Sequence, residues 1–99
     1  MKRWQELEQA VEKLLTVKGY RFWRVSNYRC FRCGQVQNAK AIGMPDYVVW
    51  YPKVFYIECK TGASKLSPEQ QEVKMLSKGR FILVRNNVDE LINYIEKTL

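Results

Sequence analysis

Two apolar runs separated by a short proline-containing segment constrain the fold of this chain most strongly. The runs are residues 46–50 and 54–60, and residues 51–53, which include Pro52, lie between them. Valine, isoleucine, phenylalanine, tyrosine and tryptophan dominate both runs, which is typical of β-strands, and a proline between two such runs favours a turn. The sequence therefore predicts an antiparallel hairpin over residues 46–60.

The rest of the sequence predicts helices before and after this hairpin along the chain. Residues 3–17 carry apolar side chains at i, i+3 and i+4 spacing, which is typical of an amphipathic helix, and Gly19 would end it. Ser67, Pro68 and Gln70 form a capping-box sequence, so a second helix is predicted to begin there. The other predicted segments are a strand over 20–26, a long loop with room for one short element over 27–43, a Gly/Ser loop over 61–66, a strand over 80–85 and a closing helix over 89–98.

These segments follow one another in the order α-β-β-β-α-β-α. No composition shift divides residues 1–99, so the chain is predicted to form one domain. The order predicts an α/β fold with a mixed four-stranded sheet flanked by helices.

Basic residues dominate one part of the chain. The net charge is +7, and no acidic residue occurs between Glu12 and Asp46. A segment of one charge sign favours a polyanionic partner, most commonly a nucleic acid, although a solvated basic surface has the same composition. Aromatic residues alternate with the basic ones and could stack on bases or pack in the core. They are Tyr20, Phe22, Trp23, Tyr28 and Phe31.

The composition also excludes several classes of protein. The chain has no histidine, which excludes histidine-based catalysis and histidine-ligated metals. No apolar run approaches the roughly 20 residues that a membrane span needs, and the N-terminus enters a polar helical pattern without a signal peptide. Since nothing marks secretion, we expect a reduced protein in the cytoplasm of a bacterium or a phage-infected host.

The cysteines are not expected to form a metal site or a redox site. Cys30 and Cys33 form a CxxC sequence, and Cys59 lies in a predicted strand. Structural zinc requires four ligands, which one chain without histidine cannot supply, although two chains could supply four cysteines across a dimer. A redox CxxC should open a helix after a strand. We interpret Cys30 and Cys33 as loop cysteines and Cys59 as a core residue, and expect no zinc.

Ionisable residues end the second strand of the predicted hairpin. Glu58 and Lys60 stand two positions apart, so they face the same side of the strand. With a three-residue turn, Asp46 falls opposite Glu58 on that face, whereas a two-residue turn would place the two carboxylates on opposite faces. We predict the three-residue turn, which brings Asp46, Glu58 and Lys60 together. Trp50, on the same face, is predicted to pack under the helix that follows.

Such a group has two interpretations. Two carboxylates suit Mg²⁺, a hard cation that keeps several waters, and a nearby ammonium can orient an attacking water and stabilise developing negative charge. The other interpretation is a cross-strand salt bridge without chemistry. The residue types alone leave both open.

The residues around this group resemble a known family. Gly43-Met44-Pro45-Asp46, an eleven-residue gap and Glu58-Cys59-Lys60 resemble the motif of the PD-(D/E)xK nuclease superfamily. The flanking sequence resembles its VRR-NUC (virus-type replication-repair nuclease) branch. The flanking residues that carry this resemblance are Lys60-Thr61-Gly62, Leu66-Ser67-Pro68-Glu69-Gln70, Leu76, Gly79 and Val84-Arg85.

Further upstream, Arg24-Val25-Ser26-Asn27 is similar to the Arg-x-Asn stretch of that branch, with one extra residue. The spacing from Glu8 to Arg24 is similar to that in archaeal-type Holliday-junction resolvases. The resemblance covers residues 4–97 apart from the loop over 28–41.

This resemblance implies a restriction-endonuclease-like core and a Mg²⁺- or Mn²⁺-dependent deoxyribonuclease. It implies that Asp46 and Glu58 hold the metal and that the carbonyl of Cys59 completes the ligand shell. Lys60 would serve the attacking water. Gln70 would position Lys60 or the water, unless its side chain serves only the capping box.

The resemblance also implies a first-helix glutamate near the metal. Glu6, Glu8 and Glu12 compete for this role. A helical wheel places Glu8 at the edge of the apolar face and directs the other two further toward solvent. We therefore assign Glu8 to the metal site.

Two functions follow from these observations. The first is an endonuclease selective for branched, junction or flap DNA in replication, recombination or repair, acting as a homodimer without a small-molecule cofactor or a membrane. The alternative is a non-catalytic nucleic-acid-binding module that uses the basic residues 13–45. DNA contacts are expected from Arg21, Arg24, Asn27, Arg29, Arg32, Lys40 and Lys65.

Overall fold

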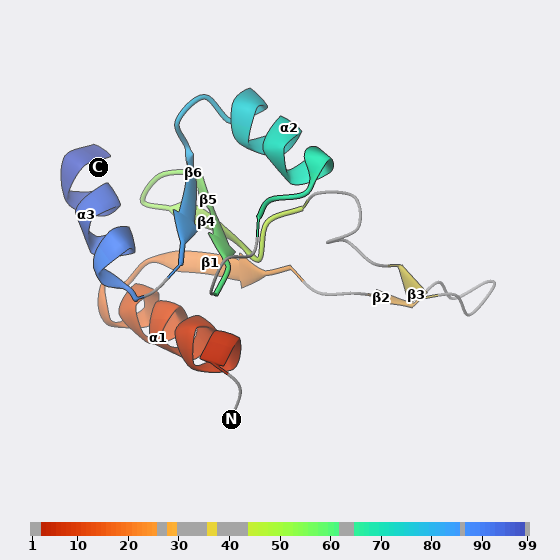
Figure 1. Ribbon diagram of the computed structural model, residues 1–99. Helices are drawn as coiled ribbons and strands as arrows, with labels where there is room; N and C mark the ends of the chain where they lie inside the picture. The colour runs from red at the N-terminus through yellow and green to blue at the C-terminus, as the bar shows by residue number, and fades with distance from the viewer. Residues whose placement is uncertain are drawn as a thin grey trace.

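The computed structural model describes residues 3–25, 28–29, 36–37, 44–61, 65–85 and 87–98. Its elements are shown in Figure 1. They are helix α1 (Arg3–Val17), strands β1 (Arg21–Arg24), β2 (Tyr28–Arg29), β3 (Val36–Gln37), β4 (Tyr47–Tyr51) and β5 (Phe55–Cys59), helix α2 (Pro68–Leu76), strand β6 (Phe81–Val84) and helix α3 (Asp89–Thr98). Apart from β2 and β3, this is the predicted order.

Four strands form one mixed sheet in the order β1-β4-β5-β6. The pairs β1–β4 and β4–β5 are antiparallel, and the pair β5–β6 is parallel. A parallel pair needs a crossover connection, and α2 lies in that connection. The α/β class and the mixed four-stranded sheet that the sequence predicts are therefore confirmed.

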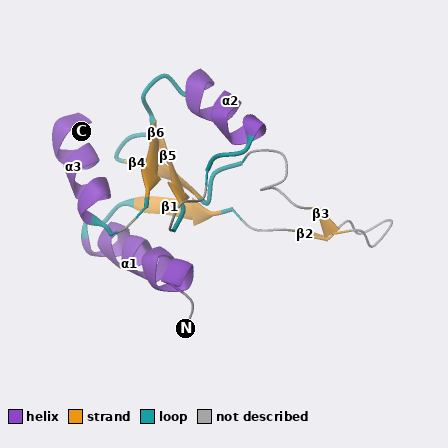
Figure 2. Ribbon diagram, viewed as in Figure 1, coloured by secondary structure: helices purple, strands orange, loops and turns teal. Residues whose placement is uncertain are grey.

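Helices lie on both faces of the sheet (Figure 2). Helices α1 and α3 pack on one face, whereas α2 lies on the other. Burial of apolar area against this first face stabilises the domain by about 25 cal/mol per Å². None of the helices in the described ranges is both long and apolar enough to cross a membrane.

The core joins α1 and α3 to one side of the strands. Its buried residues are Leu7, Val11, Leu15, Tyr47, Val49, Phe55, Ile57, Cys59, Val84, Leu91 and Ile95. Tyr20 packs edge-on against Phe55, and Phe22 packs edge-on against Tyr47. Tyr20 and Phe22 are therefore core residues rather than candidates for stacking on bases.

The predicted loop contains a short ribbon in place of one short element. Strands β2 and β3 pair antiparallel, with Tyr28 opposite Gln37 and Arg29 opposite Val36. Strands of two residues are too short to show the alternation by which a strand is recognised in a sequence. The sequence pattern therefore does not predict this pairing.

The predicted position of Trp50 under α2 is wrong. Its ring packs on Trp23 of β1, with the ring centroids 5.5 Å apart, and its side chain is 40% exposed. The reason is the strand order, because β1 lies beside β4 on the side away from β5. Trp23 pairs with Val48, so it shares a sheet face with Trp50 two positions further along β4.

Tyr47 anchors α1 to the sheet through its hydroxyl group. The hydroxyl donates a hydrogen bond of 2.7 Å to Glu12 Oε2. The pKa of Tyr47 is raised above its usual value, first because burial disfavours the charged phenolate and second because the hydroxyl donates to Glu12; the nearby charge of Glu8 adds to this. Neutral tyrosine is therefore the form that the folded state favours.

We predict that in Tyr47→Phe the free energy of unfolding falls less steeply with rising pH, above about pH 10, than in the wild type. Tyrosine in the unfolded chain ionises near pH 10. Above that pH, Tyr47 lowers the free energy of unfolding of the wild type by about 1.4 kcal/mol per pH unit, because the folded state keeps its proton. At neutral pH the variant should lose about 1 kcal/mol through the missing hydrogen bond.

Urea unfolding at neutral pH and at several values above pH 10 checks this prediction. Tyr94, whose pKa burial also raises, is present in both proteins, so its contribution cancels in the comparison. Parallel alkaline curves for the wild type and the variant would contradict the prediction.

Candidate functional site

The pairing of β4 with β5 brings Asp46 and Glu58 together. Tyr47 lies opposite Ile57, and Val48 lies opposite Tyr56. One step further in the same register, Asp46 lies opposite Glu58. The backbone N–H of Cys59 donates a buried hydrogen bond of 2.7 Å to Asp46 Oδ2, which ties the aspartate to the end of β5. The register that the three-residue turn predicts is confirmed.

Both carboxylates lie below the surface of the protein. Asp46 is 2% exposed and Glu58 is 1% exposed. Burying a charge is costly unless hydrogen bonds or an opposite charge compensate it. Among the described residues, the buried polar or charged ones are Glu8, Asp46, Glu58 and Gln70. All four are residues that the sequence singled out.

Lys60 follows Glu58 on the same side of β5. Its backbone N–H donates to the carbonyl of Val84 at 3.0 Å, so the chain still pairs with β6 beyond the end of the strand. The alternation of an extended chain therefore directs Glu58 and Lys60 to one face and Cys59 to the other. Cys59 belongs to the core, as predicted, and Lys60 is half-buried.

Gln70 forms the capping box at the start of α2. Its Oε1 accepts a hydrogen bond of 2.9 Å from the N–H of Ser67, and its own N–H donates to Ser67 Oγ at 3.2 Å. Pro68 occupies the first turn, as the sequence predicts. The capping function of Gln70 is confirmed. Its Nε2 group is a donor that the capping box does not use, and since an ammonium group accepts no hydrogen bond, this donor suits the attacking water rather than Lys60. The second role of Gln70 stays a prediction.

Glu8 forms an ion pair with Arg24. Arg24 Nη2 lies 2.9 Å from Glu8 Oε2, and Arg24 Nη1 lies 3.8 Å from Glu12 Oε2. Glu8 is 5% exposed, whereas Glu12 is half-buried and Glu6 is exposed, so Glu8 is the most buried of the three, as the helical wheel predicts. The N–H of Val25 donates to the carbonyl of Asp46, so this ion pair lies near the start of β4.

The remaining expected DNA contacts divide between surface residues and residues outside the description. Arg21 places its guanidinium 5.9 Å from the ring centre of Trp50, and Lys65 is exposed. Arg29 lies in β2, but its side chain is not among those described. Asn27, Arg32, Lys40, Cys30 and Cys33 lie outside the described residues.

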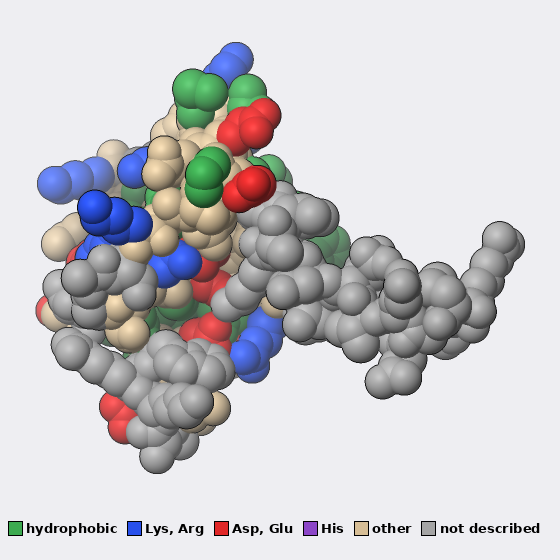
Figure 3. All heavy atoms as spheres, turned by 45° about the vertical axis from the view of Figure 1, so that its right-hand side comes forward, with side chains coloured by type: hydrophobic (Ala, Val, Ile, Leu, Met, Phe, Trp, Pro, Cys, Tyr) green, Lys and Arg blue, Asp and Glu red, His purple; other side chains and the backbone are tan. Residues whose placement is uncertain are grey.

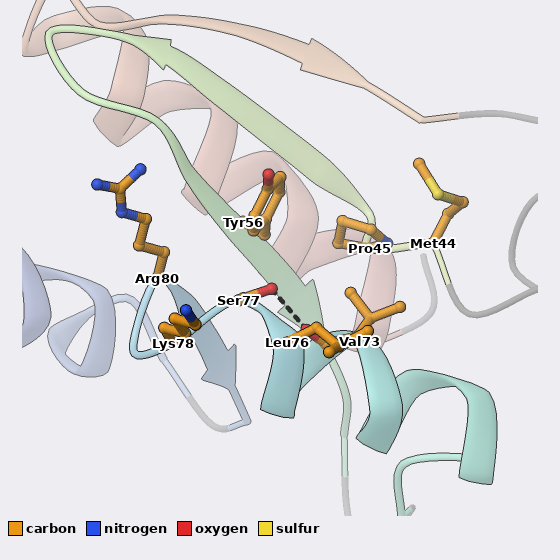
Figure 4. A pocket seen from close by; sticks show the side chains of 8 residues that line it. All are labelled: Met44, Pro45, Tyr56, Val73, Leu76, Ser77, Lys78 and Arg80. Atoms are coloured by element: carbon orange, nitrogen blue, oxygen red, sulfur yellow. Dashed lines mark hydrogen bonds between the residues drawn. The ribbon is translucent and has the colours of Figure 1, made fainter.

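A hollow of about 600 Å³ lies between α2 and the sheet (Figure 4). Its lining residues are Met44, Pro45, Tyr56, Val73, Leu76, Ser77, Lys78 and Arg80. Pro45 directly precedes Asp46, but no carboxylate lines the hollow. The hollow therefore does not contain the candidate site.

A metal ion at this site would rely on few protein side chains. Within the described ranges, no three cysteine, aspartate or glutamate side chains lie together as a metal-binding group. Mg²⁺ needs fewer, because it keeps several waters and is often held by one or two carboxylates. Figure 3 shows acidic side chains set back in the described surface with basic side chains beside them.

The contact between Trp23 and Trp50 is a surface feature that the sequence does not predict. Their pairing depends on β1 lying next to β4, and no local pattern signals that neighbour.

Comparisons with known proteins give no match to this chain: no protein-family model, no curated protein and no solved structure. The site must therefore be interpreted from its own geometry and chemistry.

We predict that Arg24→Ala lowers the free energy of unfolding by about 1 kcal/mol. The substitution leaves the buried Glu8 carboxylate without this guanidinium, but the Arg24 side chain is 55% exposed, so solvent already weakens the ion pair. A double-mutant cycle with Glu8→Gln measures the coupling, and Lys74→Ala on the exposed surface is the control. Additive effects of the two single substitutions would show that the pair contributes nothing.

Proposed function

We propose that this chain is a metal-dependent nuclease with a restriction-endonuclease-like core that hydrolyses phosphodiester bonds in DNA. The observation that carries the proposal is the placement of Asp46 opposite Glu58, both buried, with Lys60 two residues further on the same face. These are the positions at which the sequence resembles the PD-(D/E)xK motif. The flanking sequence resembles the VRR-NUC branch, and membership of that branch belongs to the same proposal.

The donor set fits a hard divalent cation. Two buried carboxylates at neighbouring strand ends repel each other, and a divalent ion between them offsets that repulsion. Asp46 and Glu58 would hold the ion, with the carbonyl of Cys59 and waters as further oxygen ligands. The hydrogen bond from the Cys59 N–H to Asp46 Oδ2 orients the carboxylate that would hold the ion. Glu8 stays a candidate for an outer ligand through water.

The remaining residues act on the water and the phosphate. A bound Mg²⁺ or Mn²⁺ supplies a lowered pKa for water and neutralises charge on the phosphate. The Lys60 ammonium orients the attacking water and stabilises the negative charge that develops on the phosphorus oxygens. The Nε2 group of Gln70 donates toward the same water. The rigid strands hold these groups in fixed positions, which lowers the entropic cost of reaction.

The basic composition supports DNA as the substrate. A net charge of +7 on 99 residues favours a polyanion and makes binding depend steeply on salt. A small domain with one metal site cuts both strands most simply as a symmetric dimer, so we propose a homodimer acting on branched, junction or flap DNA.

We predict that wild-type protein cuts DNA with Mg²⁺ or Mn²⁺ and not with EDTA. Asp46→Asn and Lys60→Met should each lower the rate by at least about 100-fold, because each removes a group that stabilises the transition state. Cleavage of labelled four-way junction, flap, single-stranded and linear duplex DNA measures this. Glu96→Gln and Lys97→Met, matched changes on exposed positions of α3, should keep full activity.

Two outcomes would contradict the nuclease. If the wild type cuts none of these substrates while salt-sensitive DNA binding persists in EDTA, the chain is a binding module. If both variants cut as fast as the wild type, the activity lies elsewhere or comes from a contaminant.

We also predict that Mg²⁺ stabilises the folded protein through this site. A ligand at ten times its Kd adds about 1.4 kcal/mol to the free energy of unfolding, which corresponds to about 5–10 °C in Tm for a domain of this size. Asp46→Asn should abolish this shift, because the amide lacks the negative charge that would hold the ion. The amide oxygen can still accept the hydrogen bond from the Cys59 N–H, so the fold should be kept. Differential scanning calorimetry with and without Mg²⁺ measures it, with Glu96→Gln as the control. An equal shift in Asp46→Asn would place the ion elsewhere.

A further inference from the structure

An aromatic and basic cluster lies on the edge strand β1 and its neighbour β4. Its members are Arg21, Trp23 and Trp50, which we call the tryptophan cluster. The two indole rings are tilted by 32° with their centroids 5.5 Å apart, and the Arg21 guanidinium lies 5.9 Å from the ring centre of Trp50. These residues come from β1 and β4, which are neighbours in the sheet.

The cluster is exposed although tryptophan is costly to leave in water. Trp23 is 63% exposed and Trp50 is 40% exposed, and Arg21 is exposed as well. By contrast, Tyr20 and Phe22, from the same part of the sequence, are packed against the core. An exposed patch of large apolar side chains marks an interaction surface. The structure therefore separates the aromatic residues that build the fold from those that are free to bind a partner.

The cluster shares a sheet face with the proposed active site. Trp50 lies four positions after Asp46 along β4, and Trp23 pairs with Val48, two positions after Asp46. At about 3.3 Å per residue, Trp23 lies roughly 7 Å and Trp50 roughly 13 Å along the strand direction from the aspartate. A nucleotide chain bound at Asp46 would reach both rings within a few nucleotides.

We propose that the tryptophan cluster is a stacking platform for the bases of unpaired nucleotides that flank the phosphate to be cut. This inference rests on the proposed nuclease function and specifies its substrate as DNA with a single-stranded segment. Aromatic faces stack on any base, whereas the bases of an intact duplex are already stacked on one another and present no face to the rings. The platform thus selects open strands without reading their sequence.

The charge of the cluster favours a nucleic acid over a second protein surface. Burying Arg21 in an apolar protein interface would require an acidic partner for its guanidinium. A nucleotide supplies both groups at once, because its base stacks on the indole and its phosphate pairs with the guanidinium. The net charge of +7 acts in the same direction.

The test is binding of a fluorescein-labelled oligothymidylate in EDTA, followed by fluorescence anisotropy and by quenching of tryptophan emission. Trp23→Leu and Trp50→Leu should each weaken binding by about 10-fold, within the range of one lost base stack, and reduce the quenching. Trp23→Phe should keep most of the affinity. Met75→Ala, which removes an apolar side chain on α2 that is 72% exposed, should change nothing.

Salt and duplex controls separate stacking from charge. The tryptophan variants should keep the salt dependence of binding, whereas Arg21→Ala should lower its slope by about one. Affinity for a blunt duplex of the same length should be unaffected by the tryptophan variants. Unfolding curves identify any variant that is misfolded. If a leucine variant is misfolded, the binding of Trp23→Phe and Arg21→Ala tests the platform instead.

The failures of the two proposals are distinguishable. If the tryptophan variants bind oligothymidylate as tightly as the wild type, the platform is wrong, whatever the cleavage assay shows. If they bind normally but change the sedimentation coefficient, the cluster is an interface between copies of the chain, which also overturns the platform. If the wild type never cuts DNA but the variants lose binding as expected, the platform holds and the nuclease is wrong.

Discussion

The register between β4 and β5 is the constraint on which the rest of the structure depends. It places Tyr47 opposite Ile57 and, one step further, Asp46 opposite Glu58. A slip of one residue would move every side chain of one strand to the other face, exposing core residues and separating the two carboxylates. The same pairing therefore decides both whether the core forms and whether the candidate site exists.

The site and the core share the end of β5. Cys59 packs in the core on one face, while its N–H holds the Asp46 carboxylate. Lys60 continues the pairing to β6 through its own N–H. Because these contacts belong to the backbone of the sheet, the polar groups are held by the most rigid part of the fold, which suits groups that must act at fixed distances.

The two faces of the sheet have different tasks. One face is covered by α1 and α3 and supplies the hydrophobic core. The other carries Asp46, Glu58 and Lys60 at one end and the tryptophan cluster along β1 and β4, with α2 over part of it. The second face is the one on which the proposed nuclease would bind DNA. On the first face, the ion pair between Glu8 and Arg24 joins α1 to the edge strand β1.

Local patterns in the sequence predict the element order, the capping box of Ser67 and Gln70, and the burial of Glu8, because these depend on neighbours within a helical turn or along one strand. The register of the hairpin follows from the length of its turn: a three-residue turn places Asp46 opposite Glu58, whereas a two-residue turn would not. The contacts of Trp50 with Trp23, of Glu8 with Arg24 and of β2 with β3 depend on the tertiary structure. These contacts join residues far apart in the chain, and their free energy depends on the sheet order and on packing, which no local pattern contains.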